Sequence, residues 1–237
     1  MALVYVPAGE FLMGSADGDA DAYSHEKPQH RVTLDAYWID KTEVTNGTYA
    51  RCVQAGACRA PSQTSSSTRS SYYGNPAYEN YPVIYVSWND AQRYCVWAGR
   101  RLPTEAEWEK AARGADGRKY PWGNAWDAGK VNSSEAGPKD ATAVGSYPAG
   151  ASPYGALDMA GNVLEWVADW YHANYYAGSP ARNPTGPASG AYRVLRGGSL
   201  RDDGGGVGAA VRRSYVPGGV NPGYVNDGYG FRCSRSP

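Results

Sequence analysis

Residues 193–233 constrain this chain most, because a strand-like stretch at each end encloses a long run with no periodicity. Residues 193–196 (RVLR) alternate polar and apolar side chains, which predicts a strand. The Gly197-Gly198 pair that follows suits a point where backbones approach closely or φ is positive. Residues 230–233 (GFRC) predict a second short strand that closes the domain. Between them, residues 200–229 have neither a helical period nor strand alternation, so we expect about thirty residues of irregular structure.

The same segment has an unusual composition. Lys, Glu, Gln, Trp and Met are absent from residues 200–237, although they provide about 30 of the first 199 residues. Every residue type present between 200 and 229 can be reached by changing the adenines of an Asn codon, AAC or AAT. The five absent types cannot, because each needs a purine in the third codon position. Two interpretations remain open: a coding segment that was rewritten at its adenines, and a glycine-rich loop that lacks long side chains.

Length and charge exclude several classes of protein. A chain of 237 residues can form one large domain or two small ones. It carries 23 basic and 23 acidic side chains, so no basic field favours nucleic acid or a membrane surface. No apolar run approaches the length of a membrane span. No signal peptide precedes the domain-like start LVYVPAGEFLMGS, which favours either a cytoplasmic protein or a domain excised from a longer one.

Three short helices are predicted by their caps. Each begins after a Ser or Thr that can accept a backbone hydrogen bond, and each ends near a glycine. The third also has Glu107 three residues after its cap, which is the pattern of a capping box. The predicted helices are residues 46–55 after Thr45, 88–98 after Ser87, and 105 to about 113 after Thr104.

The remaining periodic segments predict strands. Residues 4–6 and 10–13 predict a hairpin around a Pro-Ala-Gly turn. Residues 30–39 alternate and predict one strand with one buried face. Residues 163–169 predict another strand, with Trp166 in the core. Short helices, short and mostly antiparallel strands and long loops together indicate an α+β fold.

The four cysteines allow more than one interpretation. Cys52 and Cys58 could close a small loop, and Cys95 and Cys233 could tie the end of the chain to the second helix. All four could instead be free buried thiols. No CxxC pair or Cys/His spacing suggests zinc.

Several long motifs follow one another along the chain: VPAGEFLMGS, LDAYWIDKTEVTNGTYA, PVIYVSWNDAQRYCVWAGRRLPTEAEWEKAARG, YPWGN, YGALDMAGNVLEWVADWY, RVLRGGS and GFRC. Together they resemble the formylglycine-generating (sulfatase-modifying factor) domain family over nearly the whole chain. The resemblance implies one domain, residues 1–237, with a variant of the C-type lectin fold. It also implies that Cys233 is a structural half-cystine with Cys95 as its partner.

The resemblance does not extend to the catalytic thiols of the family. Family enzymes oxidise a substrate cysteine with oxygen, using copper and two cysteines that lie three and eight positions after the Ser of the RGGS motif. Counting from Ser199, the matching residues are Asp202 and Val207, and neither supplies the thiolate that Cu(I) needs. We therefore expect a protein that is not an enzyme and that requires no cofactor.

Variable proteins of diversity-generating retroelements use the same fold, and this chain resembles them most. Their segment between an RGGS-like and a GFR-like motif is rewritten by adenine-directed mutagenesis, which cannot produce the five residue types absent here. The resemblance implies a protein whose variable segment, about residues 200–230, binds a protein or another macromolecule of unknown identity. The alternative is a catalytically inactive or divergent member of the enzyme family. The expected ligand-binding residues are Arg201, Asp202, Asp203, Gly206, Val211, Arg213, Ser214, Tyr215, Asn221, Tyr224, Asn226, Asp227 and Tyr229, although Val211 could be core.

Calcium is the metal that the resemblance implies. Loop oxygens hold calcium in the family, and the matching residues are Asn132 and Asp140 for one site, and Asn162 and Glu165 for another. Such hard oxygen ligands suit Ca²⁺, with backbone carbonyls completing each shell. Asn162 and Glu165 could instead form hydrogen bonds that hold a turn.

Overall fold

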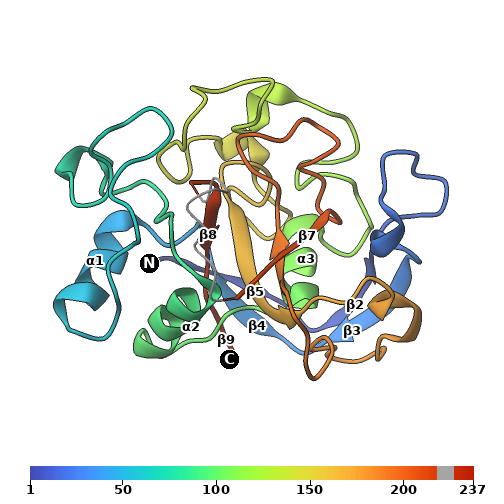
Figure 1. Cartoon of the computed structure of the whole chain (residues 1–237). Coiled ribbons are helices and arrows are strands. Elements are labelled where there is room, and N and C mark those ends of the chain that lie inside the picture. The colour runs from blue at the N-terminus through green and yellow to red at the C-terminus, as the bar shows by residue number, and fades with distance from the viewer. Residues whose placement is uncertain (218–226) are drawn as a thin grey trace.

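The computed structural model describes residues 1–217 and 227–237. Within these residues the chain forms three short α-helices and nine short strands joined by long loops (Figure 1), which confirms the predicted α+β class. No helix within these residues has the length and apolar character that crossing a membrane needs. The helices are α1 (Asn46–Gln54), α2 (Trp88–Trp97) and α3 (Glu105–Arg113), with 3-10 turns at Ser24–Glu26, Pro76–Tyr78, Ala128–Lys130, Pro148–Gly150 and Tyr175–Gly178. The strands are β1 (Leu3–Val6), β2 (Gly9–Met13), β3 (His30–Leu34), β4 (Tyr37–Asp40), β5 (Leu164–Trp170), β6 (Arg193–Arg196), β7 (Arg212–Tyr215), β8 (Tyr229–Phe231) and β9 (Ser234–Arg235).

The strands of the described residues form three sheets. The largest has the order β7-β6-β5-β8, and its pairs are antiparallel except for β5 and β8, which run parallel. In a second sheet β4 lies between β1 and β9, so the first and last strands share a neighbour. β2 and β3 form a two-stranded ribbon. In Figure 1, α3 lies behind the largest sheet and α1 and α2 lie to its left.

The N-terminal strands pair differently from the prediction. The expected hairpin between residues 4–6 and 10–13 is wrong, because β1 pairs with β4 and β2 pairs with β3. The expected single strand over residues 30–39 is two strands, β3 and β4, in different sheets. One register joins both pairs, from Leu3 opposite Asp40 to Met13 opposite His30. The Pro-Ala-Gly sequence therefore bends a long ribbon rather than reversing the chain.

The three helices confirm the predicted caps. Thr45, Ser87 and Thr104 each accept a hydrogen bond from a backbone amide three residues later, and all three sites form capping boxes. Helix α3 differs from an ordinary surface helix, because all nine of its residues are buried, including Glu105 and Glu109. Its charged side chains therefore need partners inside the protein.

Two clusters of buried apolar side chains form most of the core. Trp108 of α3 is fully buried in one cluster, and Trp166 of β5 is 1% exposed in the other, as the sequence predicted for Trp166. Disulfide bonds join Cys52 to Cys58 and Cys95 to Cys233 in the second cluster, which are the two pairings that the sequence suggested. The longer link attaches α2 to Cys233, the residue directly before β9.

Candidate functional site

The segment after Gly198 contains a strand that the sequence did not predict. β7 pairs with β6 in antiparallel register, from Arg196 opposite Arg212 to Arg193 opposite Tyr215. Its RRSY sequence lacks the alternation of apolar and polar side chains that marks a half-buried strand, so periodicity could not reveal it. β7 is an edge strand of the largest sheet and lies towards the viewer in Figure 1.

The buried guanidinium of Arg196 holds one part of the segment's backbone. It donates hydrogen bonds to the carbonyl oxygens of Ala209 and Ala210, at 2.7 and 3.0 Å. The carboxylates of Glu105 and Glu109 balance its charge, at 3.3 and 2.6 Å. Because these contacts use backbone carbonyls, they fix the path of the chain whatever side chains stand at positions 209 and 210.

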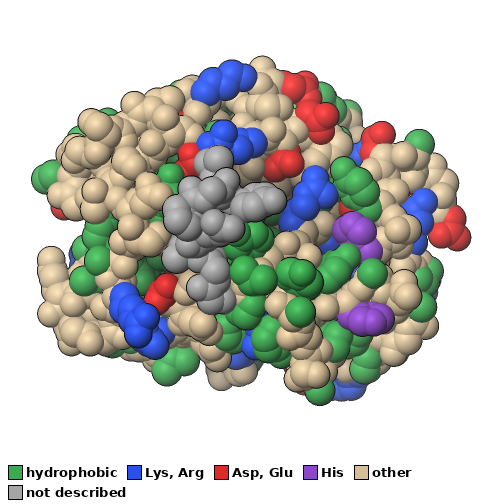
Figure 2. Space-filling model, viewed as in Figure 1, with side chains coloured by type: hydrophobic (Ala, Val, Ile, Leu, Met, Phe, Trp, Pro, Cys, Tyr) green, Lys and Arg blue, Asp and Glu red, His purple; other side chains and the backbone are tan. Residues whose placement is uncertain are grey.

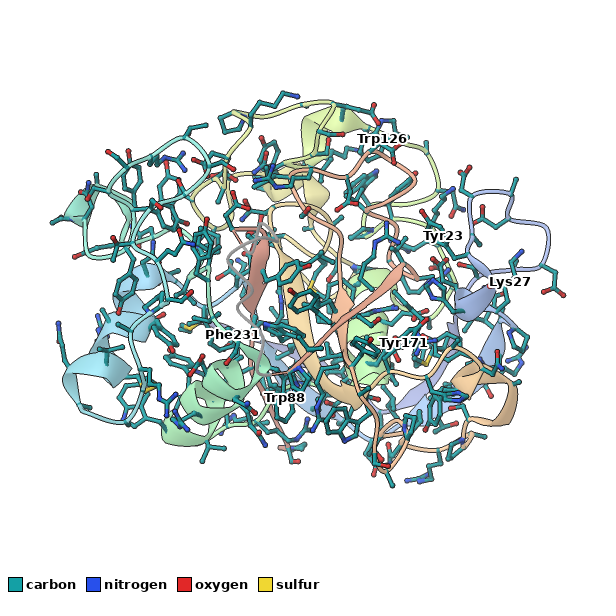
Figure 3. The ribbon with its side chains drawn as sticks, viewed as in Figure 1. Tyr23, Lys27, Trp88, Trp126, Tyr171 and Phe231 are labelled. Atoms are coloured by element: carbon teal, nitrogen blue, oxygen red, sulfur yellow. A yellow bond between two sulfur atoms is a disulfide. The ribbon has the colours of Figure 1, made fainter. Side chains whose placement is uncertain are left out.

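Other side chains from outside the segment hold Gly204. The Tyr120 hydroxyl donates to the carbonyl oxygen of Gly204 at 3.0 Å, and the Gly204 amide donates to the Glu135 carboxylate at 3.0 Å. The Trp126 indole, labelled in Figure 3, lies so close that a Cβ on Gly204 would be 2.8 Å from the ring. The backbone here is therefore set by the surrounding scaffold, and a side chain at this position would have no room.

Arg212, the first residue of β7, has a structural role. It is 1% exposed, and its Nε and Nη2 atoms donate to the Glu105 carboxylate at 2.7 and 3.0 Å. A further bond joins its Nη1 atom to the carbonyl oxygen of His25 at 2.6 Å. Burial raises the pKa of Glu105, but Arg212 and Arg196 outweigh it, so the net shift of this pKa is downward. The carboxylate therefore stays ionised and continues to anchor β7.

The remaining described side chains of the segment reach the surface to different degrees. Those of Arg201 and Asp203 are exposed. Figure 2 shows this face of the molecule, on which basic, acidic and apolar side chains are mixed. The half-buried predicted residues are Asp202, Arg213, Ser214, Tyr215 and Tyr229.

Tyr215 and Tyr229 meet although β7 and β8 lie at opposite edges of the sheet. Their ring centroids are 5.6 Å apart at an interplanar angle of 67°, and Tyr229 makes a second edge contact with Trp166 at 5.8 Å. Edge-to-face contacts of this kind are favourable for aromatic pairs. Burial is the main cause that raises the pKa of Tyr229. The two tyrosines thus bring β7 and the C-terminal end of the segment together over the core.

Three of the predicted ligand-binding residues are buried, which corrects the prediction for them. Val211 is 5% exposed, and a Cβ on Gly206 would lie 2.7 Å from the Cβ of Asp202. Asp227 is 2% exposed, and its carboxylate accepts a hydrogen bond from Arg201 at 2.5 Å. Asp227 therefore holds the exposed side chain of Arg201 in place and is not itself displayed at the surface. The predicted residues outside the described part of the chain are Asn221, Tyr224 and Asn226.

The two positions that match the family's catalytic cysteines have structural contacts. The Asp202 Oδ2 atom accepts hydrogen bonds from the amide and the hydroxyl of Ser199, at 2.9 and 2.8 Å. Its Oδ1 atom lies 3.6 Å from the Arg213 guanidinium. Val207 is fully buried, and a Cβ on Gly198 would lie 2.8 Å from its Cγ1 atom. Neither side chain offers the soft ligand that Cu(I) prefers.

Aromatic residues that the sequence did not single out extend the surface beside β7. Tyr23 is 48% exposed, its ring stacks on that of His25 with centroids 5.5 Å apart, and the Arg213 guanidinium lies 5.0 Å from its centroid. Tyr171 contacts His25 edge-on at 5.8 Å, and Figure 3 labels both tyrosines. No sequence pattern marked these residues, because they lie in loops that reach β7 only in the folded chain.

The first site expected for calcium has no carboxylate oxygen to spare. The Asp140 Oδ2 atom accepts hydrogen bonds from the hydroxyls of Ser66 and Thr68, at 2.7 and 2.6 Å. The Arg69 guanidinium lies 3.1 Å from the same oxygen. Asn132 turns its amide nitrogen towards the carbonyl oxygen of Asp140, at 3.0 Å. Protein donors therefore use this Asp140 oxygen, whereas the buried Oδ1 atom of Asn132 has no hydrogen-bond partner among the described residues.

Both residues of the second expected calcium site form hydrogen bonds with other side chains of the protein. Glu165 accepts two hydrogen bonds from the buried guanidinium of Arg232, at 2.7 and 2.6 Å, and one from the Trp108 indole at 2.9 Å. Asn162 donates from its amide nitrogen to Glu43 at 2.8 Å. Among the residues that the structure describes, no three His, Cys, Asp or Glu side chains gather as metal ligands. The Glu165 carboxylate is therefore already paired with a cation, and calcium binding at the two expected sites stays a prediction.

Three small sheets and three short helices, counted over residues 1–217 and 227–237, are joined by long irregular loops. This arrangement defines a C-type lectin-like fold of the formylglycine-generating type. The chain belongs to the family described as sulfatase-modifying factor enzyme 1-like domain, which matches residues 1–237.

Solved structures share this fold over almost their full length. PvdO from Pseudomonas aeruginosa superposes with a TM-score of 0.81 at 26% identity, covering 99% of this chain and 94% of the other. Treponema denticola variable protein 1 gives a TM-score of 0.79 at 24% identity, covering 99% and 95%. At 24% identity, the similarity to the Treponema denticola protein shows a shared fold and nothing about function.

Curated relatives differ in how much of them this chain represents. The formylglycine-generating enzyme of Streptomyces coelicolor is 39% identical over 249 residues, which cover 83% of this chain and 77% of the enzyme. The serine/threonine-protein kinase pkn1 of Chlamydia caviae is 38% identical over 258 residues, which cover 98% of this chain but 38% of the kinase. The chain therefore spans less than half the length of the chlamydial proteins that it matches.

Proposed function

We propose that this chain is a non-enzymatic ligand-binding protein of the variable type that belongs to diversity-generating retroelements. In this proposal residues 200–230 display diversified side chains and bind a protein or another macromolecule. The observation that carries the proposal is a division within the segment. Arg196 and Tyr120 hold its backbone from outside, while Arg201 and Arg213 extend towards solvent. A binding loop on a rigid scaffold of this kind accepts new side chains without loss of the fold.

The composition of the segment supports the same proposal. Lys, Glu, Gln, Trp and Met do not occur from residue 200 to the end of the chain. Adenine-directed rewriting of Asn codons accounts for this gap, and the segment with the gap includes the side chains that reach the surface. Treponema denticola variable protein 1 has the same fold, so the fold is compatible with such a role.

The chemistry of the displayed side chains suits a macromolecular ligand. Tyr215 and Tyr229 offer rigid amphipathic contact area at a low cost in conformational entropy, and Ser214 adds adaptable hydrogen bonding. Arg201 and Arg213 supply charge that can anchor an acidic partner. A surface built in this way needs no metal or other cofactor, so the proposal requires none.

The decisive experiment is to sequence the gene, its neighbouring DNA and further copies of the gene. The proposal expects a reverse transcriptase gene and a near-copy of the segment's coding sequence that differs at adenines. Copies of the protein should differ at surface positions such as 201, 203, 213 and 215, while Arg212 and Gly206 stay unchanged. Copies that vary evenly along the chain, with no adenine-biased template nearby, would refute the proposal.

A second experiment separates this proposal from the alternative of a divergent enzyme. The protein should not convert a cysteine peptide to formylglycine in the presence of copper and oxygen, because Asp202 and Val207 stand where the thiols would be. Mass spectrometry of the peptide gives the measurement, and the Streptomyces coelicolor enzyme gives the positive control. Turnover together with stoichiometric Cu(I) binding would favour the divergent enzyme.

A further inference from the structure

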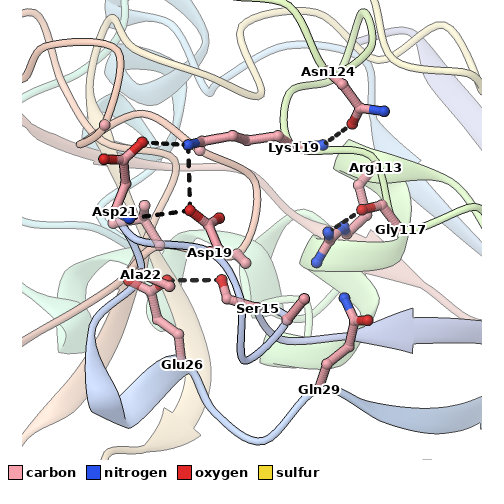
Figure 4. A pocket seen from close by; sticks show the side chains of 15 residues that line it. Ser15, Asp19, Asp21, Ala22, Glu26, Gln29, Arg113, Gly117, Lys119 and Asn124 are labelled. Carbon is pink, nitrogen blue, oxygen red and sulfur yellow. Dashed lines mark hydrogen bonds and ion pairs between the residues drawn. The ribbon is translucent and has the colours of Figure 1, made fainter.

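A cavity of about 180 Å³ lies between the loop of residues 15–29 and the first half of the segment (Figure 4). The segment contributes two glycines to its wall, and the loop contributes three carboxylates. An engineered cavity of about 150 Å³ binds benzene, so this one is large enough for a small organic group. The charged residues of the lining are Asp19, Asp21, Glu26, Arg113 and Lys119.

Both cations of this lining already have partners. The Lys119 ammonium lies 2.6 Å from Asp21 and 3.6 Å from Asp19, and Figure 4 shows these contacts across the cavity. The buried Arg113 guanidinium pairs at 2.9 Å with a carboxylate of α3 that lies outside the lining. Lys119 therefore pairs with two carboxylates of the lining, and Arg113 pairs with a carboxylate outside it. The carboxylate of Glu26, the third in the lining, has no ion-pair partner among these five residues.

Glu26 is buried, and only one of its two oxygens is satisfied. The side chain is 2% exposed, and its Oε2 atom accepts a hydrogen bond from the Ser15 hydroxyl at 2.9 Å. Its Oε1 atom has no hydrogen-bond partner within residues 1–217 and 227–237. Burial raises the pKa of Glu26. Buried polar atoms nearly always have a partner, so an unpartnered carboxylate oxygen in a cavity wall points to a donor that enters the cavity.

We propose that this cavity binds a primary ammonium group and that the Glu26 carboxylate accepts its hydrogen bonds. An ammonium supplies the donor that the Glu26 Oε1 atom lacks and a positive charge for the carboxylate of the lining that has no ion pair. The lining residues Ala16, Ala22 and Val211 offer apolar contacts to an attached alkyl chain. The ammonium belongs either to a small free amine or to a lysine side chain of a partner. The site is independent of the proposed function, because the loop and the fixed backbone of the segment form it.

Titration of the full chain with n-butylammonium chloride, followed by calorimetry or by amide NMR shifts, tests this site. We expect saturable binding that is weakened by at least about ten-fold in Glu26→Gln, because the hydrogen bond to a charged acceptor is lost. 1-Butanol has the same chain without the charge and should also bind at least about ten-fold more weakly. Asp169→Asn removes a buried carboxylate outside the cavity, so this control should bind as the unchanged protein does.

A second variant keeps the test informative if Glu26→Gln does not fold. Ala22→Leu should fill the cavity and abolish binding without changing any charge. N-acetyl-Gly-Lys-Gly has its only ammonium on the lysine side chain. Binding of this peptide as tight as that of n-butylammonium would identify a lysine side chain as the source, and binding of the free amine alone would identify a small amine.

Three results would overturn the site. These are equal affinities of Glu26→Gln and the unchanged protein, binding unaffected by Ala22→Leu, and no saturable binding of either probe. The last result would leave a buried water as the partner of Glu26.

Discussion

Arg212 and Arg213 are neighbours in β7, yet their side chains lie in opposite environments. Arg212 is 1% exposed and binds Glu105 and the carbonyl oxygen of His25. The Arg213 side chain is 30% exposed and lies 3.6 Å from Asp202. Successive side chains of a strand point to opposite faces, so one arginine faces the core and the next faces solvent. The comparison teaches that a fixed residue and a displayed residue can be direct neighbours within the segment.

The largest expected effect is that of Arg212→Ala. This substitution leaves Glu105 buried without the guanidinium that binds both of its oxygens. Breaking a buried ion pair by removing one partner costs about 3–5 kcal/mol, so we expect a loss of that size in the free energy of unfolding. Urea denaturation gives the measurement. A loss below about 1 kcal/mol, the ordinary range of mild substitutions, would mean that Arg212 is no anchor.

Asp227 sharpens the comparison, because the sequence placed it among the displayed residues and the structure buries it. Asp227→Ala removes an ion pair with half-exposed Arg201 and a hydrogen bond from Ser67. We expect a loss of about 1–2 kcal/mol in the free energy of unfolding. The matched control is Asp203→Ala, an exposed aspartate of the same segment, which should cost no more than about 0.5 kcal/mol. Equal losses at the two positions would contradict the division of the segment into buried and displayed residues.

The buried residues can also be tested through the pH dependence of stability, which the carboxyl group of Asp169 should influence. Burial, followed by the negative charge of Glu105, raises the pKa of Asp169 to about 8. An unfolded aspartate titrates near pH ~3.9, so this group stabilises the fold fully below about pH 4, and the contribution is lost as pH rises to about 8. Asp169→Asn should therefore gain about 1 kcal/mol or more over the unchanged protein at pH ~8, and less at pH ~5. Denaturation curves that coincide at the higher pH would show that burial does not control this carboxyl group.

The smallest expected changes in the free energy of unfolding are those at the displayed residues. Alanine at each of the surface positions should change the free energy of unfolding by no more than about 0.5 kcal/mol. A variant that combines them should still unfold cooperatively and should lose only ligand binding. Its failure to fold would show that these side chains belong to the core. The positions are Arg201, Arg213 and Ser214.

Local rules predicted the helices well and the strand pairing poorly. The caps at Thr45, Ser87 and Thr104 join atoms three residues apart, so the sequence contains the whole interaction. Whether residues 4–6 turn back onto 10–13 depends instead on contacts with β3 and β4, which no local pattern records. The motifs of the family therefore identified the fold where periodicity could not.

The candidate site shows the same limit. The sequence located the segment through its composition and its flanking motifs, but not which of its side chains reach the surface. β7 depends on the bond from Arg212 to Glu105, which lies 107 residues away in the chain. Asp227 is hydrogen-bonded to Ser67, 160 residues away, and Tyr23 joins the surface from a distant loop. Each of these outcomes is decided by a tertiary contact.

The Cys95–Cys233 bond gives the segment a second property, which concerns its length. β6 holds the start of the segment in the sheet. The disulfide holds Cys233, two residues after β8, against α2, so both ends stay in place whatever lies between them. For a chain with fixed ends, closure entropy grows only with the logarithm of the number of residues, by about 0.6 kcal/mol for each doubling. We expect glycine insertions beside Val216, which follows β7 and is 38% exposed, to lower the melting temperature only slightly. Evolution can therefore lengthen or shorten this segment almost as easily as it can change a side chain.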